Sequence, residues 1–215
     1  ILKKTKYFEF IKPYIVHRLD KETSGIFLIA KSRESAQFFT SLFRIRKIHK
    51  TYLAIVKGEV PRSLKKMEDQ LEYFENKKKT KLKALTFLKV LKSNYKYSFL
   101  ELNPRTGRKH QLRKQLYMRG FPIVGDTKYS LRNNKNLKDQ FMFLHSYQIK
   151  FIKNDRKFSY QANLDVDFKK YQFLHADAKS RHNLVVKDSG EIAFNIFEKE
   201  RAIKKIQNAD VIIFQ

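Results

Sequence analysis

Residues 15–25, IVHRLDKETSG, set a His, an Arg, an Asp, a Lys and a Glu beside one another between apolar neighbours. The apolar run GIFLIAK at 25–31 follows at once, so the sequence predicts a charged loop that leads into a buried strand. In an extended segment, Val16, Arg18 and Asp20 would share one side. A carboxylate at the edge of a buried strand is costly unless it is paired, so an Arg from a distant segment is the expected partner of Asp20. A structural ion pair and a catalytic carboxylate are both consistent with this position.

The composition is that of a folded domain. The chain has 215 residues, of which 42% are hydrophobic and 14% aromatic, enough to build one substantial core. It contains no apolar run near the length of a membrane span and no signal-peptide pattern. The absence of cysteine excludes disulfides, thiol nucleophiles and cysteine-based zinc sites. It also fits a reducing compartment, so we expect a cytoplasmic protein without a membrane partner.

Positive charge is the strongest global signal in the sequence. Lys and Arg number 47 against 21 acidic residues, a formal net charge of +26. Such an excess repels itself within a compact fold, and a polyanion relieves that repulsion, so nucleic acid is the expected partner. A lysine-rich proteome is the alternative explanation. An anionic membrane surface is a weaker one, because no basic amphipathic helix stands out.

Periodicity and turn residues predict a mixture of strands and helices without a regular βαβ alternation. Helices are expected after the cap Ser32 and, following a turn at 104–107, up to Gly120. Strands are expected at 25–31, 48–58, 84–93, 95–103 and 141–151, the third and fourth forming a hairpin. The Lys- and Glu-rich stretch 62–81 is expected to be exposed, part helix and part loop. The predicted fold class is α+β, with a mixed, largely antiparallel central sheet and flanking helices.

The sequence lacks the motifs that several kinds of chemistry require. No glycine-rich phosphate-binding motif is present, so no nucleotide cofactor is expected. The histidines and carboxylates lack metal-ligand spacing, so no metal is expected either. A nucleophile elbow needs glycines two positions before and after its serine, and Ser24 has Glu22 and Ile26 there. The remaining constellation is RTGRKHQLR at 105–113, which on its own predicts a basic helix start that binds phosphate.

Four ordered motifs carry a family resemblance. They read HRLDKETSGIFLIAK at 17–31, KTYLAIVKG at 50–58, PRTGRKHQLR at 104–113 with PIVGDTKY at 122–129, and FLHSYQIKF at 143–151. Together they resemble the RluA-type family of RNA pseudouridine synthases. The resemblance implies an enzyme that converts uridine to pseudouridine in RNA without a cofactor.

The resemblance also implies roles for single residues. Asp20 would be the catalytic carboxylate that acts at C1′ of the target uridine, and Arg113 would pair with it and keep it ionised. Tyr52 would stack on the uracil ring and take part in removing the C5 proton. Arg18 would enter the RNA stack where the flipped base has left. Further RNA contacts are expected from Arg105, Arg108, His110 and Gln111.

The implied architecture is a pseudouridine synthase catalytic domain over residues 1–174, N-terminally truncated relative to the family. Residues 175–215 form an extension of unknown role. Large-subunit ribosomal RNA is favoured over tRNA as the substrate, and a monomer is the simplest expectation. A catalytically idle RNA-binding or ribosome-assembly protein that keeps the motifs remains an alternative. A nonspecific basic RNA binder would explain the charge but not the motifs.

Overall fold

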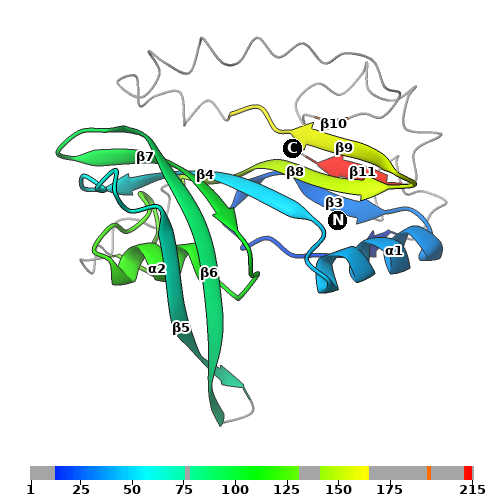
Figure 1. Cartoon of the computed structure of the whole chain (residues 1–215), viewed down its shortest axis with the longest axis horizontal. Coiled ribbons are helices and arrows are strands. Elements are labelled where there is room, and N and C mark those ends of the chain that lie inside the picture. The colour runs from blue at the N-terminus through cyan, green and yellow to red at the C-terminus, as the bar shows by residue number, and fades with distance from the viewer. Residues whose placement is uncertain (1–12, 76–77, 131–140, 165–192, 195–210, 215) are drawn as a thin grey trace.

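A computed structural model describes residues 13–75, 78–130, 141–164, 193–194 and 211–214. Its strands form two sheets, one of seven strands and one of four (Figure 1). No helix within the described ranges is long and apolar enough to cross a membrane.

The larger sheet has the order β2-β8-β4-β7-β6-β5, with β9 paired to β8. Its strands are β2 (Ser24–Gly25), β4 (His49–Lys57), β5 (Lys66–Glu75), β6 (Lys78–Ser93), β7 (Tyr97–Pro104), β8 (Leu144–Lys153) and β9 (Arg156–Gln161). Only the short β2–β8 pairing is parallel, and the other pairings in this sheet are antiparallel. The prediction of a mixed, largely antiparallel sheet is therefore confirmed, as is the hairpin formed by β6 and β7.

The smaller sheet has the order β1-β3-β11-β10. Its strands are β1 (Tyr14–Ile15), β3 (Phe27–Ala30), β10 (Ala193–Phe194) and β11 (Val211–Phe214). Strand β11 pairs antiparallel with β3, so the segment predicted to be a C-terminal extension supplies a neighbour to the strand that follows the charged loop. The rest of that segment lies largely outside the described residues.

Two helices flank the sheets, as predicted. Helix α1 (Arg33–Arg44) begins after Ser32, whose side chain accepts a hydrogen bond from the Ser35 N–H, and it buries Phe39. Helix α2 (Gln111–Met118) follows the loop after β7. Its apolar side chains Leu112 and Leu116 belong to the same core as the buried residues of β4, β6 and β7.

The prediction for residues 62–81 is wrong, because β5 and the first part of β6 form a long hairpin there. The hairpin projects from the body of the molecule (Figure 1). Along β5, Met67, Leu71 and Tyr73 are buried, while Glu68 and Glu72 are exposed. Glu68 lies 2.8 Å from the Lys66 ammonium and 2.5 Å from that of Lys83, which offsets charge within the hairpin.

Candidate active site

A cavity of about 290 Å³ opens between the charged loop, β4 and the start of α2. This volume lies at the lower end of the range of ligand-binding clefts. The lining residues come from all four sequence motifs: Arg18, Leu19, Asp20, Thr23, Lys50, Tyr52, Pro104, Thr106, Gly107, Arg108, Lys109, His110, Gln111, Leu112, Arg113 and Leu144.

His17 anchors the charged loop to the smaller sheet. Its Nε2 accepts a hydrogen bond of 2.8 Å from the backbone N–H of Leu28 in β3. Its ring lies 4.9 Å, centroid to centroid, from both Phe27 and Phe43. Two effects lower the pKa of His17 to about 3: burial, which is the larger, and the positive charge of Lys50. The neutral imidazole that this hydrogen bond needs is thus the form present at neutral pH.

The end of the same loop is anchored to the larger sheet. The Ser24 hydroxyl and the His145 Nδ1 of β8 lie 2.8 Å apart. Gly25 has a φ of 97°, and a Cβ atom there would lie 2.3 Å from the carbonyl oxygen of Ser146. Only glycine combines that backbone conformation with such a close approach to β8. Ser24 and Gly25 therefore hold the end of the loop against β8.

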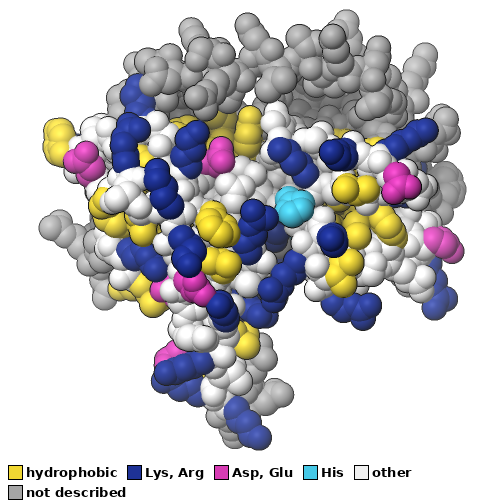
Figure 2. Space-filling model, viewed as in Figure 1, with side chains coloured by type: hydrophobic (Ala, Val, Ile, Leu, Met, Phe, Trp, Pro, Cys, Tyr) yellow, Lys and Arg dark blue, Asp and Glu magenta, His cyan; other side chains and the backbone are white. Residues whose placement is uncertain are grey.

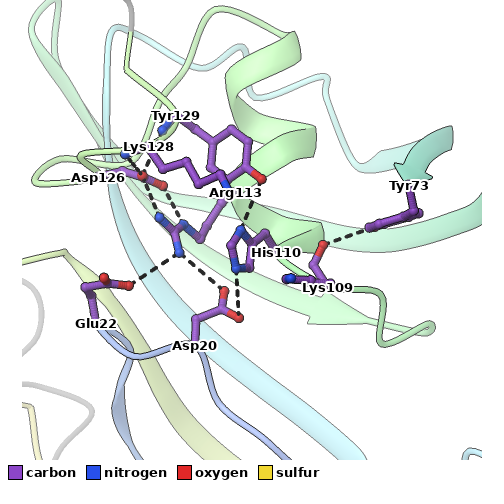
Figure 3. Close-up of polar contacts among 9 residues, drawn as sticks. All are labelled: Asp20, Glu22, Tyr73, Lys109, His110, Arg113, Asp126, Lys128 and Tyr129. Carbon is purple, nitrogen blue, oxygen red and sulfur yellow. Dashed lines mark hydrogen bonds and ion pairs between the residues drawn. The ribbon is translucent and has the colours of Figure 1, made fainter. Parts of the chain in front are cut away.

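Asp20 projects from this loop toward α2, where each of its carboxylate oxygens faces a different side chain (Figure 3). One oxygen lies 3.7 Å from the Arg113 Nη1, and the other lies 3.7 Å from the His110 Nε2. The Asp20 side chain is 17% exposed, so it remains accessible from the cavity.

Arg113 makes its shortest contacts with Asp126, which was not among the predicted site residues. Its Nε and Nη2 donate to the two carboxylate oxygens of Asp126 at 2.7 and 2.8 Å, and both side chains are buried. Burial disfavours the cation, but the hydrogen bonds and charge of Asp126 outweigh that effect and raise the pKa of Arg113. Nη1 is left to face Asp20 and, at 3.5 Å, Glu22. Arg113 thus faces Asp20 as expected, but at 3.7 Å this contact is longer than the contacts of Arg113 with Asp126.

His110 lies beside Asp20. The side chain of His110 is 15% exposed, and its Nδ1 lies 3.0 Å from the hydroxyl of Tyr129. Burial lowers the pKa of His110 more than the negative charge of Asp20 raises it. This placement makes His110 a neighbour of the candidate catalytic carboxylate, and its contact with RNA stays a prediction.

Tyr52 of β4 also lines the cavity. It is 7% exposed, and its backbone pairs with Leu102 of β7 and Ser146 of β8. The ammonium of Lys50 lies 5.9 Å from the centroid of its ring. The sheet on both sides therefore fixes the position of the aromatic ring in the cavity wall.

The other predicted RNA contacts divide into two groups. Arg18 and Arg108 line the cavity, while Arg105 is exposed and lies 5.4 Å over the ring of Phe87. Gln111 is 4% exposed, and its amide is used within the protein. Its oxygen accepts from the Thr106 hydroxyl, and its nitrogen donates to the Leu85 carbonyl and the Thr86 hydroxyl. These bonds and the one from the Arg108 N–H hold the 104–108 loop, and the contact of Gln111 with RNA stays a prediction.

Figure 2 shows one face of the molecule, on which Lys and Arg side chains predominate over Asp and Glu. This surface agrees with the formal net charge of +26 of the whole chain. Among the residues whose placement is described, no group of three His, Cys, Asp or Glu could hold a metal ion. The cavity lining combines a carboxylate, basic side chains and an aromatic ring.

Comparison with known proteins agrees with this geometry. A family model described as RNA pseudouridylate synthase matches residues 1–117. The ribosomal large subunit pseudouridine synthase D of Borreliella burgdorferi is 39% identical over 148 residues, covering 66% of this chain and 45% of that protein. The tRNA pseudouridine synthase C of Haemophilus ducreyi is 34% identical, covering 70% of this chain and 72% of that protein.

The fold of the chain is also similar to that of a solved structure. Human RNA Pseudouridylate Synthase Domain Containing 4 superposes with a TM-score of 0.64 and 26% sequence identity over 75% of each chain. The chain spans about half the length of several curated relatives, with 45% and 59% of two of them covered. From the family match, the relatives and the shared fold, the chain belongs to the RluA-type family of RNA pseudouridine synthases.

Proposed function

We propose that the chain isomerises specific uridines of RNA to pseudouridine, with Asp20 as the catalytic carboxylate. The observation that carries this proposal is the accessible carboxylate of Asp20 in a cavity with Tyr52, 3.7 Å from a buried arginine. Arg113 presents a cation to this carboxylate, and the orientation of Arg113 is fixed by Asp126.

The chemistry is balanced within one nucleotide. The N1–C1′ bond of uridine breaks, the freed uracil turns, and a C5–C1′ bond forms. C5 loses a proton and N1 ends with one, so no external reactant is consumed. An ionised carboxylate in a partly enclosed site suits the cationic character that develops at C1′ when the first bond breaks.

Two further residues fit this reaction. Tyr52 lies in the same cavity wall as a flat surface for the uracil ring, and we assign it to stacking and to the removal of the C5 proton. The target base must leave its helix, at a cost of a few kcal/mol. Arg18 lines the cavity next to Asp20, and its planar guanidinium is suited to take the place of the flipped base.

We further propose large-subunit ribosomal RNA as the substrate class, recognised by a monomer in the cytoplasm. The proposal is supported by relatives named ribosomal large subunit pseudouridine synthase C and D at 32–39% identity. A relative named tRNA pseudouridine synthase C makes tRNA the competing substrate. Arg105, exposed beside the cavity loop, is the basic residue we assign to the flanking RNA.

Release of tritium from RNA labelled at uridine C5 tests the proposal, with ribosomal RNA and tRNA supplied separately. The wild-type chain should release label, preferentially from ribosomal RNA, and Asp20→Asn should reduce release to background. Asp155→Asn makes the same chemical change at an exposed turn between β8 and β9, and should be as active as the wild type. Equal release by Asp20→Asn would refute the assigned role of Asp20. RNA binding without release by the wild type would favour the non-catalytic alternative.

A further inference from the structure

Asp126, Tyr129 and His110 form a chain of contacts that ends at the carboxylate of Asp20. The His110 imidazole lies between the Tyr129 hydroxyl, 3.0 Å from its Nδ1, and Asp20, 3.7 Å from its Nε2 (Figure 3). The second contact is longer than a hydrogen bond, so it is electrostatic in the free protein. Arg113 approaches the other oxygen of Asp20, so the two side chains bracket the carboxylate.

Asp126, the first residue of this chain of contacts, fixes the position of Tyr129. One oxygen of Asp126 accepts hydrogen bonds of 2.9 Å from the backbone N–H groups of Lys128 and Tyr129. The Tyr129 ring lies 5.2 Å from the Arg113 guanidinium and packs edge-on against His110, with 5.6 Å between ring centroids. One buried carboxylate thus orients both the arginine and the tyrosine that approach the site from α2 and the following loop.

The carboxylate that faces the ring favours one direction of the hydrogen bond. The Asp20 oxygen 3.7 Å from Nε2 can only accept, so a hydrogen on Nε2 is favoured and Nδ1 is left to accept from Tyr129. Burial raises the pKa of Tyr129, so its hydroxyl keeps its proton at neutral pH and can donate to Nδ1 of His110. Burial lowers the pKa of His110, so the imidazole is neutral and has one donor and one acceptor nitrogen. When Nδ1 accepts, the single ring hydrogen lies on Nε2, the atom that faces Asp20.

The backbone of His110 indicates that this placement is imposed by its surroundings. His110 precedes α2 with φ 52° and ψ 29°, a left-handed conformation that costs a non-glycine residue ~1 kcal/mol or more. The side chain makes no cap hydrogen bond to the helix, so capping does not compensate that cost. The described contacts that do involve the ring are those with Tyr129 and Asp20.

We propose that His110 and Tyr129 are positioning residues for Asp20. Tyr129 holds neutral His110 in the tautomer whose Nε2–H faces one oxygen of Asp20, while Arg113 faces the other. The carboxylate is thereby fixed in the orientation from which it meets C1′. The effect on the reaction rests on the proposed function, whereas the tautomer of His110 does not.

The tautomer can be measured without activity. In the full chain labelled with 15N-histidine, long-range proton–nitrogen correlation spectra distinguish the protonated from the unprotonated ring nitrogen, and His110→Gln assigns the signal. At neutral pH the wild type should show hydrogen on Nε2, and Tyr129→Phe should lose this preference. Tyr95→Phe, at an exposed tyrosine, should leave it unchanged. Hydrogen on Nδ1 in the wild type, or an unchanged signal in Tyr129→Phe, would overturn the proposal.

Single-turnover tritium release and RNA binding supply the second readout. His110→Ala and Tyr129→Phe should slow release by about tenfold or more with RNA affinity unchanged, because misplacement of a reacting group is costly. His110→Gln keeps an N–H near the position of Nε2 and should recover part of the rate. Weaker RNA binding with an unchanged rate would instead show that His110 contacts RNA. If the wild type releases no label, the proposed function fails, while the tautomer spectra still decide the geometry.

Discussion

The stability of the fold should depend on the protonation of His17. Its Nε2 accepts the Leu28 N–H at 2.8 Å, and its ring is enclosed by Phe27 and Phe43. Burial, followed by the charge of Lys50, lowers the pKa of His17 from 6.5 to about 3. Protonation would remove the acceptor and place a charge among apolar rings, so the folded state resists it.

The sign and size of the effect follow from linkage. Between pH 6.5 and 3 the unfolded chain binds a proton at His17 that the folded chain does not. The free energy of unfolding therefore rises with pH across this window and levels off above the unfolded pKa, with a slope of about 1.4 kcal/mol per pH unit. From pH 7 to pH 5, His17 alone should cost about 2 kcal/mol of stability.

Urea denaturation at the two pH values measures this quantity. The loss of stability from pH 7 to pH 5 should be about 2 kcal/mol smaller in His17→Gln than in the wild type. His49→Gln, at an exposed histidine, controls for removing an imidazole. The same loss in the wild type and in His17→Gln would refute the reasoning. If His17→Gln does not fold, a proton NMR titration of the wild type decides the matter, since His17 should remain neutral at pH 5.

Three further changes have outcomes that follow from single contacts. Gly25→Ala should destabilise the fold by ~3 kcal/mol or more in urea denaturation, because the new Cβ would meet the β8 backbone at 2.3 Å. Asp126→Ala should cost ~3–5 kcal/mol by the same assay, because it leaves the buried cation of Arg113 without its closest partner. Hydrogen bonds from lysines, Lys66 first, lower the pKa of Glu68 to about 2, so Lys66→Met should raise that pKa in a carboxyl NMR titration.

Matched controls separate these causes from general effects of mutation. Gly120→Ala places a Cβ at a similar φ of 79° where no atom lies within 4 Å, so it should cost much less than the change at Gly25. Lys65→Met, at an exposed lysine beside Lys66, should leave the titration of Glu68 unchanged. Equal losses at the two glycines, or equal shifts with the two lysines, would contradict the proposed contacts.

Local signals in the sequence were sufficient for much of the fold. Helix α1 has a serine cap, an acidic first turn and an apolar stripe, which specify its start and its buried face within one segment. The β6–β7 hairpin is similarly marked by two β-rich runs around Asn94. These elements could be predicted because each carries its own boundaries.

The β5–β6 hairpin could not be recognised in the same way. Strand β5 reads KMEDQLEYFE, in which charged residues alternate with apolar ones and no β-branched residue appears. Glu68 and Glu72 pair with lysines of β6, and those pairs exist only once the register is set. Glu68, for example, pairs with Lys83, which lies 15 positions further along the chain.

The site shows the same division between local and tertiary information. The motif resemblance singled out Asp20 and Arg113, but the geometry adds Asp126 as the main partner of the arginine. Asp126 lies in the PIVGDTKY segment that carried part of the resemblance, so its sequence signal was present. Its bidentate contact depends on how the loop after α2 folds back on that helix, which no periodicity in the sequence encodes.

The charged segment 15–25 joins the two sheets, and this has a consequence for the site. His17 binds β3 of the smaller sheet, whereas Ser24 and Gly25 bind β8 of the larger one. Asp20 lies between these anchors, so its position relative to α2 depends on both sheets at once. Loosening either anchor should therefore reduce activity before the chain unfolds. In the acid range where His17 begins to lose its neutral form, we expect tritium release to fall at pH values where the bulk of the fold persists.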